Sequence, residues 1–257
     1  MNYEDCQYPF GSPLTKVEQY NRSPKQAFVL GVYASAVHAR WSGPAGQLLV
    51  GALAVASEPE IFWRGDPVQA SAIINQISIS PELGELKPAA KANNGPSGRA
   101  LDELILSPLN LNRDNTWLCD LIPYSLANEN QLRVITEKYL PLVEQYDLPV
   151  PSIPPVPLQL TDAKRRSAIL TELETSQAET LILLGDKPIQ WFLDYYVDTK
   201  INRLADFTNN YGASRILQIN GRHYSVYAFA HPRQIAGLGF HSGKWFDLHQ
   251  KWLASQS

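Results

Sequence analysis

The sequence predicts an α/β fold in which a short, mostly parallel sheet lies between two layers of helices. Short apolar runs recur along the chain, of the kind that forms strands buried on both faces. Segments with helical spacing of apolar residues alternate with these runs, which favours a largely parallel sheet covered by helices. A chain of 257 residues with 44% hydrophobic residues also has enough apolar surface for a large core.

Four apolar runs are expected to supply the main strands. They are Ala27–Leu30, Thr116–Ile122, Thr180–Leu184 and Tyr224–Ala230. Helical spacing predicts helices around Leu101–Ile105, Leu132–Tyr139, Ala163–Ser176, Pro188–Tyr196 and Trp245–Trp252. Asn220-Gly221, between two β-rich runs, predicts a tight hairpin turn.

A second hairpin is expected as an insertion after the first strand. Its strands are predicted to be Gln47–Ala56 and Glu60–Trp63, joined by a turn at Glu58-Pro59. Ser71–Ile79 fits a helix and a strand equally well. The loop after the first strand would then hold His38 and Arg40.

We expect a single domain spanning residues 1–257. Residues 1–26 contain three prolines and a glycine, Pro9, Gly11, Pro13 and Pro24, which predicts an irregular arm. Five prolines between Pro149 and Pro157 predict an extended surface segment. Because helices and strands continue to alternate after it, we interpret this segment as a crossing within the domain.

Composition excludes several classes of protein. A formal net charge of −3 excludes a broadly basic, sequence-blind nucleic-acid binder but leaves room for a local basic groove. No apolar run is long enough to span a bilayer, and the acidic start of the chain lacks the apolar region of a signal peptide. Cys6 and Cys119 are too few for an iron–sulfur or four-cysteine zinc site. We therefore expect a soluble cytoplasmic protein without a metal or other cofactor.

Four segments resemble, in the same chain order, motifs of the uracil-DNA glycosylase superfamily. They are Gly31-Val32-Tyr33-Ala34-Ser35, Gly95-Pro96-Ser97-Gly98-Arg99-Ala100-Leu101-Asp102-Glu103-Leu104, Thr180-Leu181-Ile182-Leu183-Leu184-Gly185 and His231-Pro232-Arg233-Gln234-Ile235. Together they extend over most of the chain. The resemblance implies a glycosylase-like α/β/α fold and a protein that binds DNA or another ligand containing a nucleobase.

The resemblance also implies site residues. His231 would donate a hydrogen bond to the departing base, whose negative charge develops as the glycosidic bond breaks. Ile235 would wedge into the duplex while the target base flips, and Arg233 and Ser97 would contact DNA. The base pocket would be formed by the loops after the strands. Its residues would be Gly31, Tyr33, Ala34, Ser35, His38 and Asn94.

Some positions depart from the superfamily pattern. Tyr33 stands where several branches have a water-orienting aspartate or asparagine, and Ala34 replaces the usual proline. Asn93 stands where iron–sulfur relatives have a stacking phenylalanine, so Tyr33 or Trp41 would have to stack on the base. These departures argue against ordinary uracil excision.

Asp120 is the second candidate catalytic residue. It lies inside an apolar strand, where a carboxylate is costly unless it is paired or functional. Relatives often have an asparagine there that contacts the base edge. An ionised aspartate only accepts hydrogen bonds, so it would select a base that presents donors. Asp120 could instead position the attacking water, or be a structural residue that caps a loop or pairs with an arginine such as Arg40.

Two other segments have simpler interpretations. We interpret Gly65-Asp66-Pro67 as a turn and Lys164-Arg165-Arg166 as a solvated helix face. The leading hypothesis is a divergent, metal-independent DNA glycosylase-like protein of the base-excision type. The alternatives are a non-catalytic relative that binds a base or nucleic acid and a hydrolase that acts on free nucleosides.

Overall fold

The computed structural model describes residues 3–198, 201–238 and 242–256, and the chain divides into two compact units. Each unit is assembled from three separate segments of the chain. Unit 1 comprises Met1–Val17, Ala34–Pro96 and Pro123–Leu158, and unit 2 comprises Glu18–Tyr33, Ser97–Ile122 and Gln159–Ser257. The predicted α/β class is confirmed, with a mostly parallel sheet and covering helices in unit 2 and a small antiparallel sheet in unit 1.

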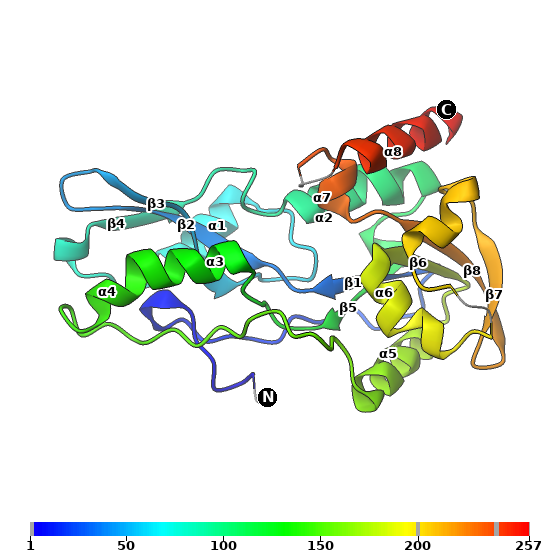
Figure 1. Ribbon diagram of the computed structural model, residues 1–257, viewed down its shortest axis with the longest axis horizontal. Helices are drawn as coiled ribbons and strands as arrows, with labels where there is room; N and C mark the ends of the chain where they lie inside the picture. The colour runs from blue at the N-terminus through cyan, green and yellow to red at the C-terminus, as the bar shows by residue number, and fades with distance from the viewer. Residues whose placement is uncertain (1–2, 199–200, 239–241, 257) are drawn as a thin grey trace. The chain divides into compact units, whose positions relative to one another are not determined.

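Unit 2 contains a five-stranded sheet in the order β5-β1-β6-β8-β7 (Figure 1). Its strands are β1 (Ala27–Tyr33), β5 (Thr116–Ile122), β6 (Thr180–Leu184), β7 (Arg215–Ile219) and β8 (Arg222–Phe229). All pairs are parallel except β7 with β8. Every residue of β5 is buried, as the apolar run predicts for a strand that is covered on both faces.

Helices lie on both faces of this sheet. α2 (Pro96–Leu101), α7 (Pro232–Ile235) and α8 (Gly243–Gln256) lie on one side of the strands, and α5 (Ala163–Ser176) and α6 (Asp186–Trp191) lie on the other (Figure 1). A π-helical turn, Asp102–Leu106, follows α2. Short 3₁₀ turns complete the unit at Ser107–Leu109, Arg113–Asn115, Leu193–Tyr195 and Leu204–Asn210.

The predicted turn at Asn220-Gly221 is confirmed. Both residues have positive φ, 48° for Asn220 and 80° for Gly221, as a two-residue turn of type I′ requires. The turn sets the register in which Ile219 lies opposite Arg222. β7 therefore forms the antiparallel edge of the sheet.

Unit 1 contains a three-stranded antiparallel sheet in the order β3-β2-β4. Its strands are β2 (Ala36–Ser42), β3 (Leu48–Ser57) and β4 (Glu85–Pro88), and its helices are α1 (Pro67–Ile74), α3 (Glu129–Val134) and α4 (Leu140–Val143). Shorter helical turns lie at Pro9–Gly11, Pro81–Leu83 and Ile135–Tyr139. The core is aromatic, with the ring of Phe10 in edge contact with Trp41 and Tyr139.

The inserted hairpin forms, but with a different partner from the one predicted. β3 pairs with β2 through a turn at residues 43–47, and residues 60–63 form no strand. His38 and Arg40 therefore lie on a strand and not in a loop. The expectation was wrong because polar residues alternate with apolar ones at residues 36–42, so this half-buried strand could not be recognised. Its apolar face packs into the core of unit 1.

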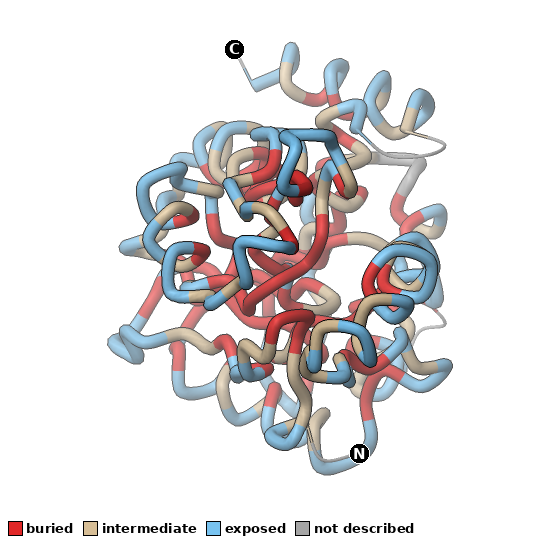
Figure 2. Tube along the Cα trace, turned by 90° about the vertical axis from the view of Figure 1, so that its left-hand side faces the viewer, coloured by how far each residue is buried: buried red, intermediate tan, exposed pale blue. Residues whose placement is uncertain are grey.

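Gly65-Asp66-Pro67, predicted to be a turn, forms the start of a helix, whereas residues 149–157 lack helix, as predicted for an extended segment. Asp66 begins α1 as its N-cap, and its carboxylate accepts hydrogen bonds from the backbone N–H groups of Val68 and Gln69 at 2.9 and 2.8 Å. Residues 149–157 form no helix and contribute one isolated bridge, Ala127 to Pro155. Figure 2 shows that buried residues are concentrated along the strands and exposed residues along helices and loops. No helix in the described part of the chain is long and apolar enough to cross a membrane.

Candidate functional site

The candidate site lies at the carboxyl ends of the parallel strands of unit 2. In the sheet register Asp120 on β5 lies opposite Gly31 on β1, and Leu184 on β6 lies opposite Phe229 on β8. The register of β1 with β6 places these pairs in one row, so all four side-chain positions face the same side of the sheet. This edge of a parallel sheet is where ligands of open α/β folds bind.

Two glycines lie at this edge of the sheet. Gly31 is the immediate neighbour of Asp120 in the sheet, and Gly185 follows the end of β6. Gly185 has φ of 89°, and a Cβ atom added there would meet only His231, at 3.9 Å. At Gly31 and Gly185 the backbone bears no side chain, which permits close approach of a ligand, whereas the Leu184 side chain on β6 is fully buried.

Asp120 is a buried acid with an unpartnered oxygen. The residue is 3% exposed, and within the described chain its Oδ1 atom has no hydrogen-bond partner. Burial raises the pKa of this carboxyl to about 7, and the positive charge of Arg165 opposes that rise only in part. Near neutral pH the carboxyl therefore exchanges between its neutral and ionised forms.

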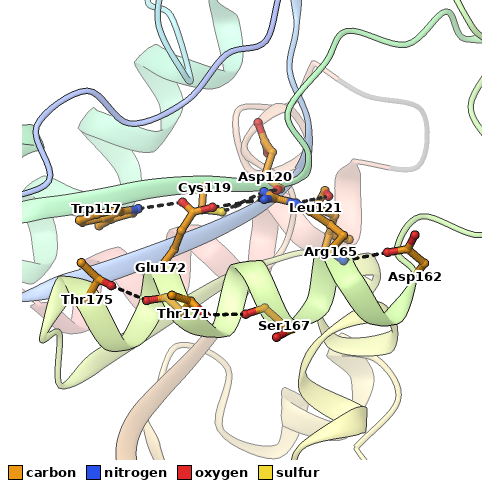
Figure 3. Close-up of polar contacts among 10 residues, drawn as sticks. All are labelled: Trp117, Cys119, Asp120, Leu121, Asp162, Arg165, Ser167, Thr171, Glu172 and Thr175. Carbon is orange, nitrogen blue, oxygen red and sulfur yellow. Dashed lines mark hydrogen bonds and ion pairs between the residues drawn. The ribbon is translucent and has the colours of Figure 1, made fainter. Parts of the chain in front are cut away.

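Arg165 on α5 holds the backbone at Asp120. Its guanidinium donates to the carbonyl oxygens of Asp120 at 2.6 Å and Leu121 at 3.0 Å, and it is paired with Glu172 at 3.2 Å. Figure 3 shows these contacts on one side of β5, with the Asp120 carboxyl pointing away from α5. Arg165 therefore fixes the strand from one face while the carboxyl group stays free on the other.

The prediction of a solvated helix face for Lys164-Arg165-Arg166 is wrong for two of its three residues. Arg165 has the contacts described above. Arg166 donates to the Thr161 carbonyl oxygen at 3.1 Å, and its guanidinium stacks 3.7 Å from the ring centre of Tyr195. A run of basic residues in the sequence does not show whether an arginine will hydrogen-bond to the backbone of a strand or lie exposed to solvent.

Tyr33 lies on the same face of the sheet as Asp120. It is two residues beyond Gly31 on β1, so its side chain follows in the same row of alternating positions. The pKa of its hydroxyl is raised, first by burial and then by the nearby charge of Asp120, while Arg233 acts in the opposite direction. The charges of Asp120 and Arg233 therefore both act on the Tyr33 hydroxyl.

His231 begins α7 as its N-cap. Its Nδ1 atom accepts a hydrogen bond from the backbone N–H of Arg233 at 3.3 Å. Burial, with a contribution from the charge of Arg233, lowers the pKa of His231 to about 4, so the ring is neutral at physiological pH. Because Nδ1 accepts, the neutral ring has its proton on Nε2, which leaves one N–H group to donate to a ligand.

The structure separates the predicted site residues between the two units. Gly31, Tyr33, Ser97, Asp120, His231, Arg233 and Ile235 belong to unit 2, and Ala34, Ser35, His38 and Asn94 belong to unit 1. Within unit 1 the Asn94 side chain bonds both backbone groups of His38, accepting from N–H at 2.8 Å and donating to the carbonyl oxygen at 2.9 Å. The backbone N–H of Ser35 donates to Glu58 at 3.0 Å.

Ile235, the predicted wedge, is fully buried. Its side chain is therefore not presented on the surface as insertion between bases requires. Leu238 follows in the same segment and is 46% exposed, and sequence reasoning missed it. Ile235 is the last residue of α7 and is buried, whereas Leu238 lies beyond the end of that helix.

Comparison with known proteins adds no relative. No protein-family model matches the chain, and a search of curated proteins finds no match. In the described residues no three His, Cys, Asp or Glu side chains lie close enough together to hold a metal ion. The site itself comprises a buried acid, Asp120, a neutral imidazole donor, His231, and an arginine, Arg233.

Proposed function

We propose that this chain binds a nucleobase at the carboxyl edge of the unit 2 sheet and hydrolyses its N-glycosidic bond, as a DNA glycosylase does. The observation that supports this proposal is the unpartnered Asp120 carboxyl at the edge where His231 keeps a free N–H group. Backbones of β5 and β8 are three strand spacings apart, about 14 Å. Asp120 on β5 and His231, two residues beyond the end of β8, can therefore contact one planar ring between them.

The neutral state of His231 suits this reaction. When the bond between C1′ and the base nitrogen breaks, its electron pair stays with the base. The oxygen of a water molecule forms the new bond to C1′, and the proton that this water loses ends on the base. The N–H group of His231 stabilises the negative charge on the base by a hydrogen bond in a buried environment. Its pKa of about 4 keeps the ring a hydrogen-bond donor that needs no prior protonation.

Asp120 would contact the edge of the base. Its ionised carboxylate accepts two hydrogen bonds and suits an edge with two adjacent donors, such as an N–H beside an amino group. Its neutral form offers one donor and one acceptor, as an asparagine does. With a pKa of about 7, base preference is expected to change around neutral pH. A role in positioning the attacking water instead would make Asp120→Asn lose turnover on every base rather than change the preference.

The test uses labelled oligonucleotides, single-stranded and duplex, that carry uracil, hypoxanthine, xanthine or alkylated bases, and free nucleosides in parallel. Abasic sites are scored after alkaline cleavage for the wild type, His231→Ala and His223→Ala. His223 is an exposed histidine on β8, the strand that leads to His231, and is the matched control.

Cleavage that is lost in His231→Ala and kept in His223→Ala supports the proposal. Binding without cleavage of any base would refute hydrolysis and favour a non-catalytic base-binding relative. Turnover of free nucleosides, without salt-sensitive DNA binding, would make the protein a nucleoside hydrolase.

A further inference from the structure

A hydrogen-bonded chain behind the candidate site ends at the residue before His231. His249 on α8 is fully buried, with Nε2 2.8 Å from the carbonyl oxygen of Leu104 and Nδ1 2.9 Å from the Tyr211 hydroxyl. The same hydroxyl lies 3.3 Å from the backbone N–H of Ala230. All four residues belong to unit 2.

The direction of every bond in this chain is determined. A carbonyl oxygen only accepts, so Nε2 of His249 has the proton and donates to Leu104. Nδ1 of the neutral ring then accepts, and the Tyr211 hydroxyl donates to it. A lone pair of the Tyr211 oxygen remains for the N–H of Ala230. Burial lowers the pKa of His249 and raises that of Tyr211, which keeps both groups in these neutral forms.

Aromatic rings enclose the imidazole. The ring centres of Tyr211, Phe229 and Trp252 lie 5.8, 5.6 and 5.0 Å from that of His249. Next to Tyr211, Gly212 has φ of 80°, and a Cβ atom there would lie 2.1 Å from the ring of Trp252. Tyr211 is thus fixed both by its neighbour in the chain and by the rings, with little room for an alternative orientation.

Ala230 is the point where strand pairing gives way to the loop. Phe229 still accepts a bond from the N–H of Gly185, at 2.8 Å, and Ala230 lies beyond the last residue of β8. Its N–H group is held by Tyr211, and the next residue is His231. The Tyr211 hydroxyl therefore anchors the start of the segment that orients His231.

We propose that Tyr211 and His249 are positioning residues that hold the loop carrying His231 in the orientation that the candidate site uses. The inference rests on the proposed function for its catalytic consequence, but its structural content can be tested separately. Leu104 connects the same chain of bonds to the π-helical turn after α2, where regular α-helical bonding is interrupted. The hydrogen bonds thus connect α8 and the π-helical turn, through Tyr211, to the backbone N–H of Ala230.

The decisive variant is Tyr211→Phe, because it removes the hydroxyl and keeps the ring that packs against Phe229 and His249. Its matched control is Tyr227→Phe on β8, whose hydroxyl makes no hydrogen bond to the described residues. Hydrogen exchange of the Ala230 amide and ¹⁵N resonances of the histidine rings are measured in both variants. Exchange at Ala230 is expected to accelerate about tenfold or more in Tyr211→Phe only.

Two further readouts separate positioning from general stability. The Nδ1 resonance of His249 is expected to shift in Tyr211→Phe, since that atom loses its donor, and the resonances of His231 are expected to shift with it. On whichever base the oligonucleotide panel shows to be cleaved, kcat should fall about tenfold with little change in KM, because Asp120 and the backbone around it remain. His249→Phe should reproduce the faster Ala230 exchange, and the double variant should add little to it.

Unchanged Ala230 exchange and unchanged His231 resonances in Tyr211→Phe would overturn the inference. An equal effect in Tyr227→Phe would overturn it as well, since a general loosening of β8 would then explain the data. If the protein cleaves no glycosidic bond, the proposed function fails, while the exchange and resonance measurements still decide whether Tyr211 anchors the His231 loop.

Discussion

Replacement of Asp120 by asparagine is expected to stabilise the protein more strongly as pH rises. The folded state raises the pKa of this carboxyl from 3.8 to about 7, so it binds the proton more tightly than the unfolded chain does. Stability from this group is complete below pH 3.8 and is lost as pH rises through 7. At 1.36 kcal/mol for each pH unit, the total loss is about 4 kcal/mol, of which roughly 2.5 kcal/mol falls between pH 5 and pH 8.

Asparagine has the same shape and does not titrate, so the variant avoids this loss. The free energy of unfolding is measured by urea denaturation of the wild type and Asp120→Asn at several pH values from 5 to 8, with tryptophan fluorescence as the signal. The difference between the two proteins is expected to grow by roughly 2.5 kcal/mol over this range. Asp247→Asn, at an exposed aspartate of α8, is the control, for which the difference should stay within about 0.5 kcal/mol.

A constant difference between Asp120→Asn and the wild type from pH 5 to pH 8 would refute this reasoning. It would mean that the carboxyl ionises as easily in the folded protein as in the unfolded chain. A direct check is the ¹³C resonance of the Asp120 carboxyl, which should titrate near pH 7.

Three other predictions concern Arg165, His231 and Gly212. Arg165→Met should destabilise the protein by about 3 kcal/mol in urea denaturation and raise the pKa of Asp120 further, since the opposing charge is lost. In the folded protein the pKa of His231 is about 4, against 6.5 in the unfolded chain, so about 3 kcal/mol of stability present above pH 6.5 should be lost as pH falls to 4. His231→Gln should not lose this stability in acid. The same loss of stability in acid for the wild type and His231→Gln would contradict the assignment. Gly212→Ala should lower the free energy of unfolding by roughly 2 kcal/mol more than Gly221→Ala does, because both glycines have φ of 80° but only a Cβ atom at Gly212 would meet a ring. Equal melting temperatures of the two variants would contradict this.

Much of unit 2 could be predicted from the sequence because its parallel strands are buried on both faces. Continuous apolar runs such as Thr180–Leu184 have a plain local signal, and so does the Asn220-Gly221 turn. Strand β2 could not be recognised, since His38 and Arg40 interrupt its apolar residues and its partner is set by tertiary packing. The division of the chain into two units also has no local signal, because segments far apart in the sequence make up each unit.

Part of the candidate site could likewise be predicted from the sequence, and part of it could not. Asp120 could be singled out because a carboxylate inside an apolar run is unusual, and its burial with an unpartnered oxygen agrees with that reasoning. Arg165 and the pair Tyr211 and His249 were missed. Their roles depend on contacts across 45 and 38 residues of sequence, which no spacing rule at the level of helices or strands detects. The roles proposed for Asp120 and His231 in catalysis stay predictions.

The order of strands in the unit 2 sheet has a consequence during synthesis on the ribosome. β1 is made first, yet it lies inside the sheet between β5 and β6. About 150 residues separate it from β6, so at ordinary elongation rates one edge of β1 waits roughly 10 to 30 seconds for its partner. During that interval an apolar strand with unpaired backbone groups can bind another nascent chain. The sheet order thus leaves one edge of β1 unpaired until β6 has been synthesised.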